Sequence, residues 1–386
     1  MIRTARRRTL RLESLEGRQL MAAGNLSPEA AETIAVSNMA RQNPAAIAQW
    51  ALAEPGIKDT LKYYGVDPGK FNGDLKAIPS RPPLAWTDSL NQAAQSQSDY
   101  EAQVGQQTHI GANGADLGSR LNNAGYTGAS SAAENTYAYA SNADNAVRSF
   151  LIDWGVADLG HRVNLLQTND SAKSFNEVGV GFTRTSNKGL GPEVVTMDFG
   201  RHDAARPYLL GFAFAQDADG YYKAGEGRGG VQVRIDQVDG HGNPTGVTQT
   251  ITTDPSGAYE TQVDPGTYRV AATLNGTLVR SSTVNVGSDN VEFDIKMNGP
   301  WDTPPAPPSV TPATQVVQPQ TKSPAATPDK GNATAQPVAP PKVDAPAAPV
   351  NAPANVLAQA IEQFGNINLS GLKAYNNIDF SSIQGF

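Results

Sequence analysis

The sequence contains no cysteine, little histidine and few charges of either sign. Charged residues make up 17% of its 386 residues, the formal net charge is −7, and there are four histidines. Without cysteine there is no disulfide framework, no thiolate metal site and no cysteine nucleophile. The acidic balance argues against a nucleic-acid binder, which would carry a basic patch. The composition fits either a cytosolic protein or a bacterial envelope protein that folds without disulfides.

Long apolar runs are also missing, because no stretch approaches the roughly 20 residues of a membrane span. Residues 1–25 begin with a cluster of Arg but lack the apolar core of about 7–15 residues that a signal peptide needs. Composition alone would make them a disordered basic tail. The stretch LESLEGRQLMAA nevertheless resembles a Leu-Glu-Pro-Arg-x-Leu-Leu motif of many exported bacterial proteins, with Gly17 and Met21 as departures. This resemblance predicts an export segment and an extracytoplasmic protein, either secreted or associated with the cell surface.

Residues 26–203 combine helical periodicity with a late change to strand periodicity. Ser27 and Pro28 predict a helix start, and the apolar pattern then continues towards Trp50. Further helices are expected over 87–104, 116–124 and 142–152, and an antiparallel hairpin over 177–200. Several helices with a small late sheet indicate an α+β fold, an α-β-α sandwich.

The rest of the chain changes character twice. Residues 207–298 hold short strand patterns separated by turns such as DGHGNP, DPSG and DPGT, which predicts a small β-sandwich. Residues 299–353 are rich in Pro and Ala and poor in aromatic residues, so burial cannot offset their ordering entropy and a linker is expected. Residues 354–386 regain apolar residues, and we assign them no role.

Three residues in the first domain carry groups suited to chemistry: His109, Glu134 and His161. They are too far apart in sequence to share one helix face. If the fold brings them together, two imidazoles and a carboxylate form the donor set of a catalytic-type Zn²⁺ site with an open fourth position. The same three groups could act as acid and base without metal. Taken singly, each residue is more often structural or solvated.

The order of short motifs resembles one protein family. HIGANGADLGSRLNNAGY is followed by AEN, then GHRVNLL, EVGVGF and MDFG. Over residues 30–202 this order resembles the CAP superfamily of cysteine-rich secretory proteins, venom antigens and plant pathogenesis-related proteins, also called SCP domains. The bacterial branch is the most similar. The resemblance implies that His109, Glu134 and His161 line one cleft.

The resemblance also implies roles for the neighbours of His161. Arg162 and Asn164 would brace the turn that carries this histidine, and Arg120 would be structural. The eukaryotic pattern has a second Glu after a Trp, a position that Asp153 or Asp158 could fill here. This departure weakens a metal site. In the family the cleft binds divalent metal in some members and small ligands or lipids in others.

The second domain resembles the B-type repeats of bacterial surface adhesins (SdrD-B or Cna-B like), which are Ig-like sandwiches. Many of these bind Ca²⁺ through an acidic loop, because Ca²⁺ takes six to eight oxygen ligands. Asp217, Asp219 and Glu226 match that loop, whereas Ala215 and Lys223 depart from it. A simple Asp-Gly turn is the alternative interpretation.

Three functions remain open from the sequence. The first is a non-enzymatic module that binds a small molecule, a lipid or a cell-envelope component, displayed on the β domain and a Pro-rich stalk. The second is a metal-dependent or acid–base hydrolase that uses His109, Glu134 and His161. Against it, the chain has no Gly-x-Ser-x-Gly elbow and no His-Glu-x-x-His motif. The third is a structural cell-surface protein with a vestigial cleft.

Overall fold

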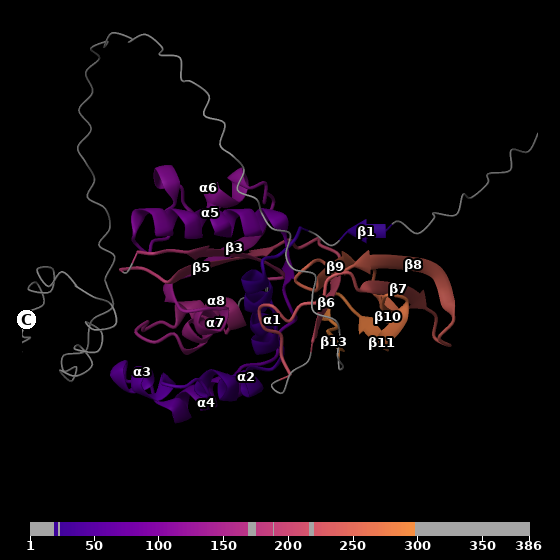
Figure 1. Cartoon of the computed structure of the whole chain (residues 1–386), viewed down its shortest axis with the longest axis horizontal. Helices are drawn as coiled ribbons and strands as arrows, with labels where there is room; N and C mark the ends of the chain where they lie inside the picture. The colour runs from indigo at the N-terminus through magenta and orange to yellow at the C-terminus, as the bar shows by residue number, and fades with distance from the viewer. Residues whose placement is uncertain (1–18, 22–23, 169–174, 188, 216–219, 298–386) are drawn as a thin grey trace, which may run out of the picture.

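The computed structural model describes residues 19–21, 24–168, 175–187, 189–215 and 220–297. The predicted Pro-rich linker, the segment 354–386 and most of the export segment lie outside these residues. The described part consists of a domain of helices around one sheet and a second domain made of strands (Figure 1). None of its helices is long and apolar enough to span a bilayer.

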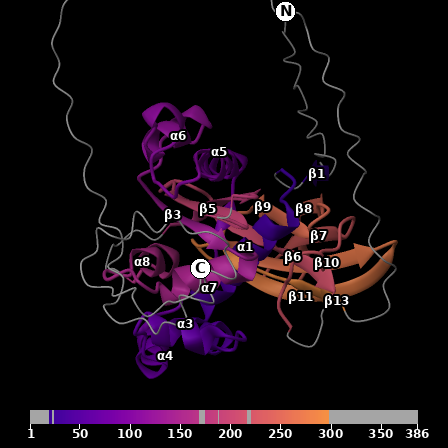
Figure 2. The ribbon, with the colours of Figure 1, turned by 60° about the vertical axis from the view of Figure 1, so that its left-hand side comes forward.

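The first domain has three layers, as expected. Its helices are α1 (Pro28–Gln42), α2 (Pro44–Leu52), α3 (Ile57–Tyr63), α4 (Pro68–Ala77), α5 (Asp88–Val104), α6 (Leu117–Asn123), α7 (Ala143–Ile152) and α8 (Gly160–Leu166). Its sheet has the order β2-β4-β5-β3, from β2 (Ala85–Trp86), β3 (Ser131–Ala140), β4 (Glu177–Arg184) and β5 (Glu193–Arg201). Helices α5 and α6 cover one face of the sheet, and α1, α7 and α8 lie against the other (Figures 1 and 2).

Local sequence signals fix most helix starts. The Ser27 hydroxyl accepts a hydrogen bond from the Ala30 amide at 3.1 Å, which confirms the predicted cap. The helical spacing that continues towards Trp50 belongs to two helices, α1 and α2. Asn43 ends α1, and its side chain accepts from the Ala46 amide at 3.0 Å to cap α2. The proline at position 44 lacks an amide hydrogen and so favours a new first turn there.

Strand alternation divides the sheet into a polar and an apolar face. Glu134 on β3 lies opposite Asp198 on β5, and both side chains point to the α5–α6 side. On the other face Val195, Met197 and Phe199 join the main apolar core. Helix α5 approaches β4 so closely that a Cβ at Gly179 would lie 2.1 Å from the Leu90 backbone. The glycines of the VGVG stretch are therefore required by packing.

The second domain contains the short strands that the turn pattern predicts. One sheet has the order β1-β8-β7-β10-β11, and the other joins β12, β6 and β13, with β9 paired to β6. The strands are β1 (Gln19–Met21), β6 (Tyr208–Ala215), β7 (Gln232–Val238), β8 (Pro244–Thr252), β9 (Ala258–Gln262), β10 (Gly266–Leu274), β11 (Thr277–Val286), β12 (Val291–Glu292) and β13 (Ile295–Met297). Strand β11 was not predicted, because its Ser- and Thr-rich sequence carries little alternation.

The two domains share one core. Phe212 and Phe214 of β6 belong to the same buried cluster as Ile34 of α1. The rings of Trp86 and Phe212 lie 5.5 Å apart, and the Trp86 amide donates to the Glu260 carboxylate at 3.0 Å. The domains are thus packed against each other directly.

Candidate functional site

Glu134 is the buried centre of a small ionic network on the α5–α6 face of the sheet. Its Oε1 accepts a hydrogen bond from His109 Nδ1 at 2.7 Å, and its Oε2 accepts from Arg120 Nη2. The Arg120 and Glu134 side chains are 4% and 3% exposed, whereas that of His109 is 60% exposed. Arg120 also donates to the His109 carbonyl oxygen at 2.9 Å. The network therefore positions the exposed imidazole of His109 through its hydrogen bond to the buried Glu134 carboxylate.

Two further carboxyl groups lie beneath this network. Asp198 is fully buried, and neither of its oxygens has a hydrogen-bond donor among the described residues. Burial, and then the neighbouring Glu134 carboxylate, raise the pKa of Asp198 well above its usual value. Burial also raises the pKa of Glu101, although Thr108 and Thr136 donate hydrogen bonds to it. The surroundings of Asp198 therefore favour its neutral form.

His161 belongs to a separate pair on the opposite side of the sheet. Its Nδ1 donates to Asp153 Oδ1 at 2.7 Å, and Asp153 Oδ2 accepts from the Arg162 amide at 3.1 Å. The Asp153 side chain is 1% exposed and that of His161 is 22% exposed. Asp153 has a left-handed backbone with φ of 57°, which ends α7 and turns its carboxylate back towards α8. The carboxylate fixes the ring so that Nε2 faces outward.

The edge strand β3 lies between the two histidines. The Asn135 side chain donates to the His161 carbonyl oxygen at 2.9 Å, while its neighbour Glu134 binds His109 on the other face. Asn164 donates to the Asn135 side chain at 2.9 Å and to the Glu134 carbonyl oxygen at 3.3 Å. The structure therefore joins His109 directly to Glu134 and links His161 to them through two asparagines. No group of three or more His, Asp or Glu side chains in the described ranges is arranged to hold a metal ion.

Comparisons with known proteins now bear on this geometry. The sequence model of the cysteine-rich secretory protein family (CAP) matches residues 80–199. This stretch contains His109, Glu134, Asp153 and His161. The chain contains a CAP domain. No curated protein matches the sequence.

Solved structures show more limited similarity. An extracellular SCP-domain protein of Bacillus anthracis is 24% identical, with a TM-score of 0.25, over 36% of this chain and 43% of that one. The chain thus spans less than half of that structure. An outer surface protein of Borrelia burgdorferi is 15% identical, with a TM-score of 0.25, over 31% of this chain and 78% of that one. A putative carbohydrate-binding protein of Pseudomonas aeruginosa is 14% identical, with a TM-score of 0.16, over 25% and 90%. The assignment of the CAP domain rests on the sequence match.

Arg162, the residue after His161, binds the end of the preceding helix. Arg162 donates to the carbonyl oxygens of Leu151 and Ile152 at 2.5 and 2.6 Å, which ties α8 to the end of α7. Of the two candidates for the missing second acid, Asp153 contacts His161, whereas Asp158 is exposed on the loop before α8.

Of the predicted calcium ligands, only Glu226 falls within the described residues; Asp217 and Asp219 lie outside them. The Glu226 carboxylate accepts a hydrogen bond from the Lys223 amide at 3.0 Å. This contact is the kind that closes a turn. The calcium site stays a prediction.

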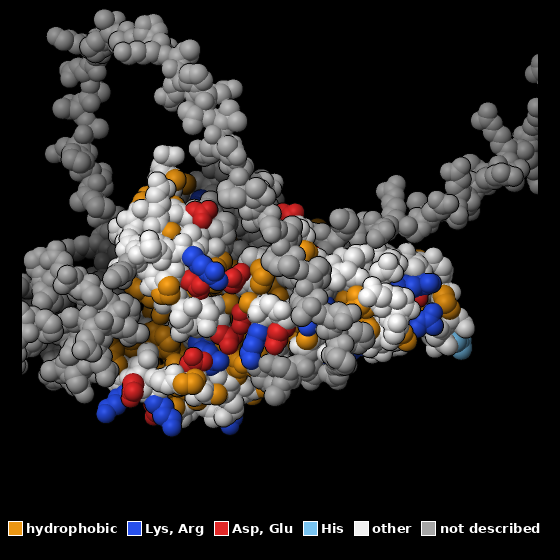
Figure 3. Space-filling view, viewed as in Figure 1, with side chains coloured by type: hydrophobic (Ala, Val, Ile, Leu, Met, Phe, Trp, Pro, Cys, Tyr) orange, Lys and Arg blue, Asp and Glu red, His pale blue; other side chains and the backbone are white. Residues whose placement is uncertain are grey.

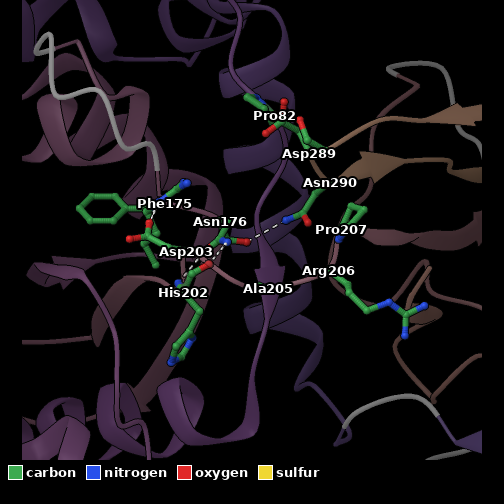
Figure 4. Close-up of a pocket in the computed structure, with 12 residues that line it drawn as sticks. Pro82, Phe175, Asn176, His202, Asp203, Ala205, Arg206, Pro207, Asp289 and Asn290 are labelled. Carbon is green, nitrogen blue, oxygen red and sulfur yellow. Dashed lines mark hydrogen bonds and ion pairs between the residues drawn. The ribbon is translucent and has the colours of Figure 1, made fainter. Parts of the chain in front are cut away.

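Sequence reasoning missed His202, which lies where the CAP domain meets the β domain. Its Nδ1 faces Glu177 Oε2 at 2.7 Å, and its Nε2 faces the Thr127 carbonyl oxygen at 2.9 Å. Both partners are hydrogen-bond acceptors, an arrangement that favours the imidazolium form of the ring. His202 also lines a small pocket at the domain junction, where Asn290 donates to the Asn176 carbonyl oxygen at 2.8 Å (Figure 4). No motif in the sequence marks this histidine.

Proposed function

We propose that this is an exported bacterial protein whose CAP domain binds a ligand without transforming it. The ligand would be a small molecule, a lipid or another component of the cell envelope, held at the edge of β3 between His109 and His161. The β domain and the Pro-rich sequence would display the CAP domain outside the cytoplasm. The motif LEGRQLM in the N-terminal segment supports the extracytoplasmic location.

The observation that carries this proposal is the state of Glu134. Both of its oxygens have partners, one on His109 and one on Arg120, and its side chain is 3% exposed. A carboxylate in this state would have to break a buried ion pair before it could take a proton from a substrate. Breaking a buried pair costs about 3–5 kcal/mol. Glu134 therefore serves to present His109, which suits binding better than acid–base turnover.

A divalent metal fits the same residues poorly. Arg120 already neutralises Glu134, and a second cation would have to displace this guanidinium from a buried position. We therefore derive no step through Zn²⁺ here. Titration of the full chain with Zn²⁺, monitored by calorimetry, checks this expectation: a tight site of one equivalent that is lost in His109→Ala would contradict it. A parallel Ca²⁺ titration of wild type and Glu226→Gln tests the calcium prediction.

The His161–Asp153 pair favours acid–base hydrolysis as a second candidate function. A buried carboxylate that orients an imidazole and leaves Nε2 free is the arrangement of a general base. The described residues show no serine or threonine hydroxyl bonded to His161. The pair would therefore act on a water molecule.

One experiment separates binding from hydrolysis. Full-length protein is incubated with purified peptidoglycan, and separately with vesicles of phosphatidylglycerol and phosphatidylcholine, and the bound fraction is measured after sedimentation. We expect binding to one probe that His109→Ala and His161→Ala each reduce at least tenfold. The matched control is His241→Ala, an exposed histidine in the turn between β7 and β8. Soluble products released by wild type and lost in His161→Ala would establish hydrolysis instead. Equal binding by all four proteins would refute a role for the two histidines.

A further inference from the structure

Five aromatic side chains form one patch on the CAP domain: Tyr63, Tyr64, Tyr137, Tyr139 and Trp154. The rings of Tyr64 and Trp154 are nearly parallel, 14° apart in orientation, with centroids 6.2 Å apart. Tyr63 packs edge-on against Tyr64 at 4.9 Å, and Tyr137 against Tyr139 at 6.1 Å. Tyr64 also lies near enough to Tyr137 and Tyr139 for their hydroxyl groups to interact electrostatically with its own. We call these five residues the aromatic patch.

The aromatic patch is open to solvent. Tyr64 and Tyr139 are 40% and 53% exposed, the highest values for aromatic side chains in the described part of the chain. Hydrophobic side chains gather between α3 and the sheet in the space-filling view (Figure 3). The patch combines the end of α3, the edge strand β3 and the turn after α7. Exposed aromatic rings drawn from three separate elements are typical of an interaction surface.

The chain itself supplies a matching sequence. Of its 27 Pro residues, most lie after β13, and they include the run Pro337-Val338-Ala339-Pro340-Pro341-Lys342. A Pro-x-x-Pro sequence favours an extended polyproline II conformation, which has no internal hydrogen bonds and packs well against aromatic rings. Tyrosine hydroxyl groups at the patch can donate hydrogen bonds to the free carbonyl oxygens of such a polyproline II segment.

The length of the chain beyond β13 lets this run reach the aromatic patch. About 40 residues separate Met297 from Pro337, which at about 3.1 Å per residue span roughly 120 Å. A compact body the size of the two domains measures roughly 50 Å across. Charge is also compatible, because Lys342 follows the prolines and the exposed Asp158 follows Trp154 by four residues.

We propose that residues 337–342 bind the aromatic patch of their own chain. The patch adjoins the His161 end of the candidate site, since Trp154 follows Asp153 and the Phe150 ring lies between those of Tyr137 and His161 at 6.3 and 5.4 Å. The bound segment would therefore compete with ligands that approach His161. This inference does not depend on the proposed function, because it concerns the patch and the Pro-rich sequence alone.

The test measures how tightly full-length proteins bind a fluorescein-labelled peptide of residues 334–345, by fluorescence anisotropy. A tethered segment acts at an effective concentration on the order of 1 mM. Suppose that the free peptide binds the patch with a dissociation constant about tenfold below this effective concentration. The tethered segment of wild type then competes with the peptide and weakens the apparent peptide affinity about tenfold. The tail variant Pro337→Ala/Pro340→Ala/Pro341→Ala should therefore bind the peptide about tenfold more tightly than wild type. A matched variant, Pro312→Ala/Pro319→Ala/Pro324→Ala, should bind it as wild type does.

The patch is tested in the background of the tail variant. Tyr64→Ala and Tyr139→Ala, each with an unchanged circular dichroism spectrum, should weaken peptide binding at least tenfold. Leu278→Ala, which removes a 60% exposed side chain from β11, should leave it unchanged. Equal affinities for wild type and the tail variant would overturn the proposal. So would peptide binding that survives both tyrosine substitutions, or binding that depends on protein concentration because a second copy supplies the segment.

Discussion

The two histidine–carboxylate pairs of the CAP domain have the same separation but different surroundings. His109 and Glu134 lie 2.7 Å apart, as do His161 and Asp153. Glu134 is also bound by the buried Arg120 side chain and faces a second carboxyl group, Asp198. Asp153 is bound by a backbone amide and has no arginine side chain on its carboxylate among the contacts of the described residues. The first pair is therefore held by charge and the second by backbone geometry.

The largest effect expected from this difference is that of Arg120→Met. The substitution leaves Glu134 ionised and buried beside Asp198, and stranding a buried charge costs about 3–5 kcal/mol. The free energy of unfolding, measured by urea denaturation at pH 7, should fall by that amount. The double variant Arg120→Met/Glu134→Gln should recover a large part of the loss. Arg184→Ala, whose side chain is 73% exposed, should change stability by less than about 1 kcal/mol. A loss under 1 kcal/mol for Arg120→Met would show that charge does not hold the first pair.

The second pair should respond to backbone geometry instead. Asp153→Ala removes the carboxylate and places alanine in a left-handed conformation, which together should cost about 2–3 kcal/mol. Asp153→Asn should cost about 1 kcal/mol, because asparagine tolerates this conformation and keeps one acceptor. The same urea measurement compares the two. Equal losses would mean that the backbone conformation contributes nothing.

The buried acid next to the first pair makes stability depend on pH. The pKa of Asp198 is raised in the folded protein, so the unfolded chain loses this proton at lower pH than the folded chain does. Stability contributed by this group therefore falls as pH rises above the unfolded pKa of about 4. Asp198→Asn imitates the neutral acid and should stabilise the protein by on the order of 1 kcal/mol at pH 8. The gain should shrink towards pH 4. Thermal unfolding of wild type and Asp198→Asn at pH 8 and pH 4 measures this stabilisation. An equal stabilisation at both pH values would contradict the prediction.

The sequence predicted the parts of the site that depend on local order. The cap at Ser27 and the pair of strands that carries the VGVG stretch follow from neighbouring residues. The family motifs pointed to three side chains, two of which, His109 and Glu134, the structure joins directly. The motifs did not show that the Glu134 side chain and His161 lie on opposite faces of the sheet, because that depends on the strand register. Strand β3 itself was not predicted, since AENTYAYA mixes alternation with alanines of low strand propensity.

The sequence could not predict which residues far apart in the chain contact one another at the site. Arg120 was expected to be structural, but its partner could not be chosen among the many acids of the chain. Asp198 lies in the MDFG motif, but the motif did not mark it as a site residue. Only the register with Glu134 makes its burial costly. His202 likewise depends on Glu177 and Thr127, which come from different elements. The partners of these side chains can be identified only from the packed structure, because they come from separate elements.

The smallest expected effect is on the protonation of one side chain of the first pair, His109. The hydrogen bond to Glu134 raises the pKa of His109 above its usual 6.5, in spite of partial burial that acts in the opposite direction. Titration followed by NMR of the imidazole resonances should show this. In Glu134→Gln the hydrogen-bond acceptor loses its charge, and the pKa of His109 should fall towards or below 6.5. With only four histidines in the chain, His241→Ala, His202→Gln and His161→Ala together identify three signals and so assign the fourth to His109. If the His109 titration is unchanged in Glu134→Gln, then the imidazole is not held by that carboxylate in solution, and the first pair would owe its position to Arg120 and the backbone instead.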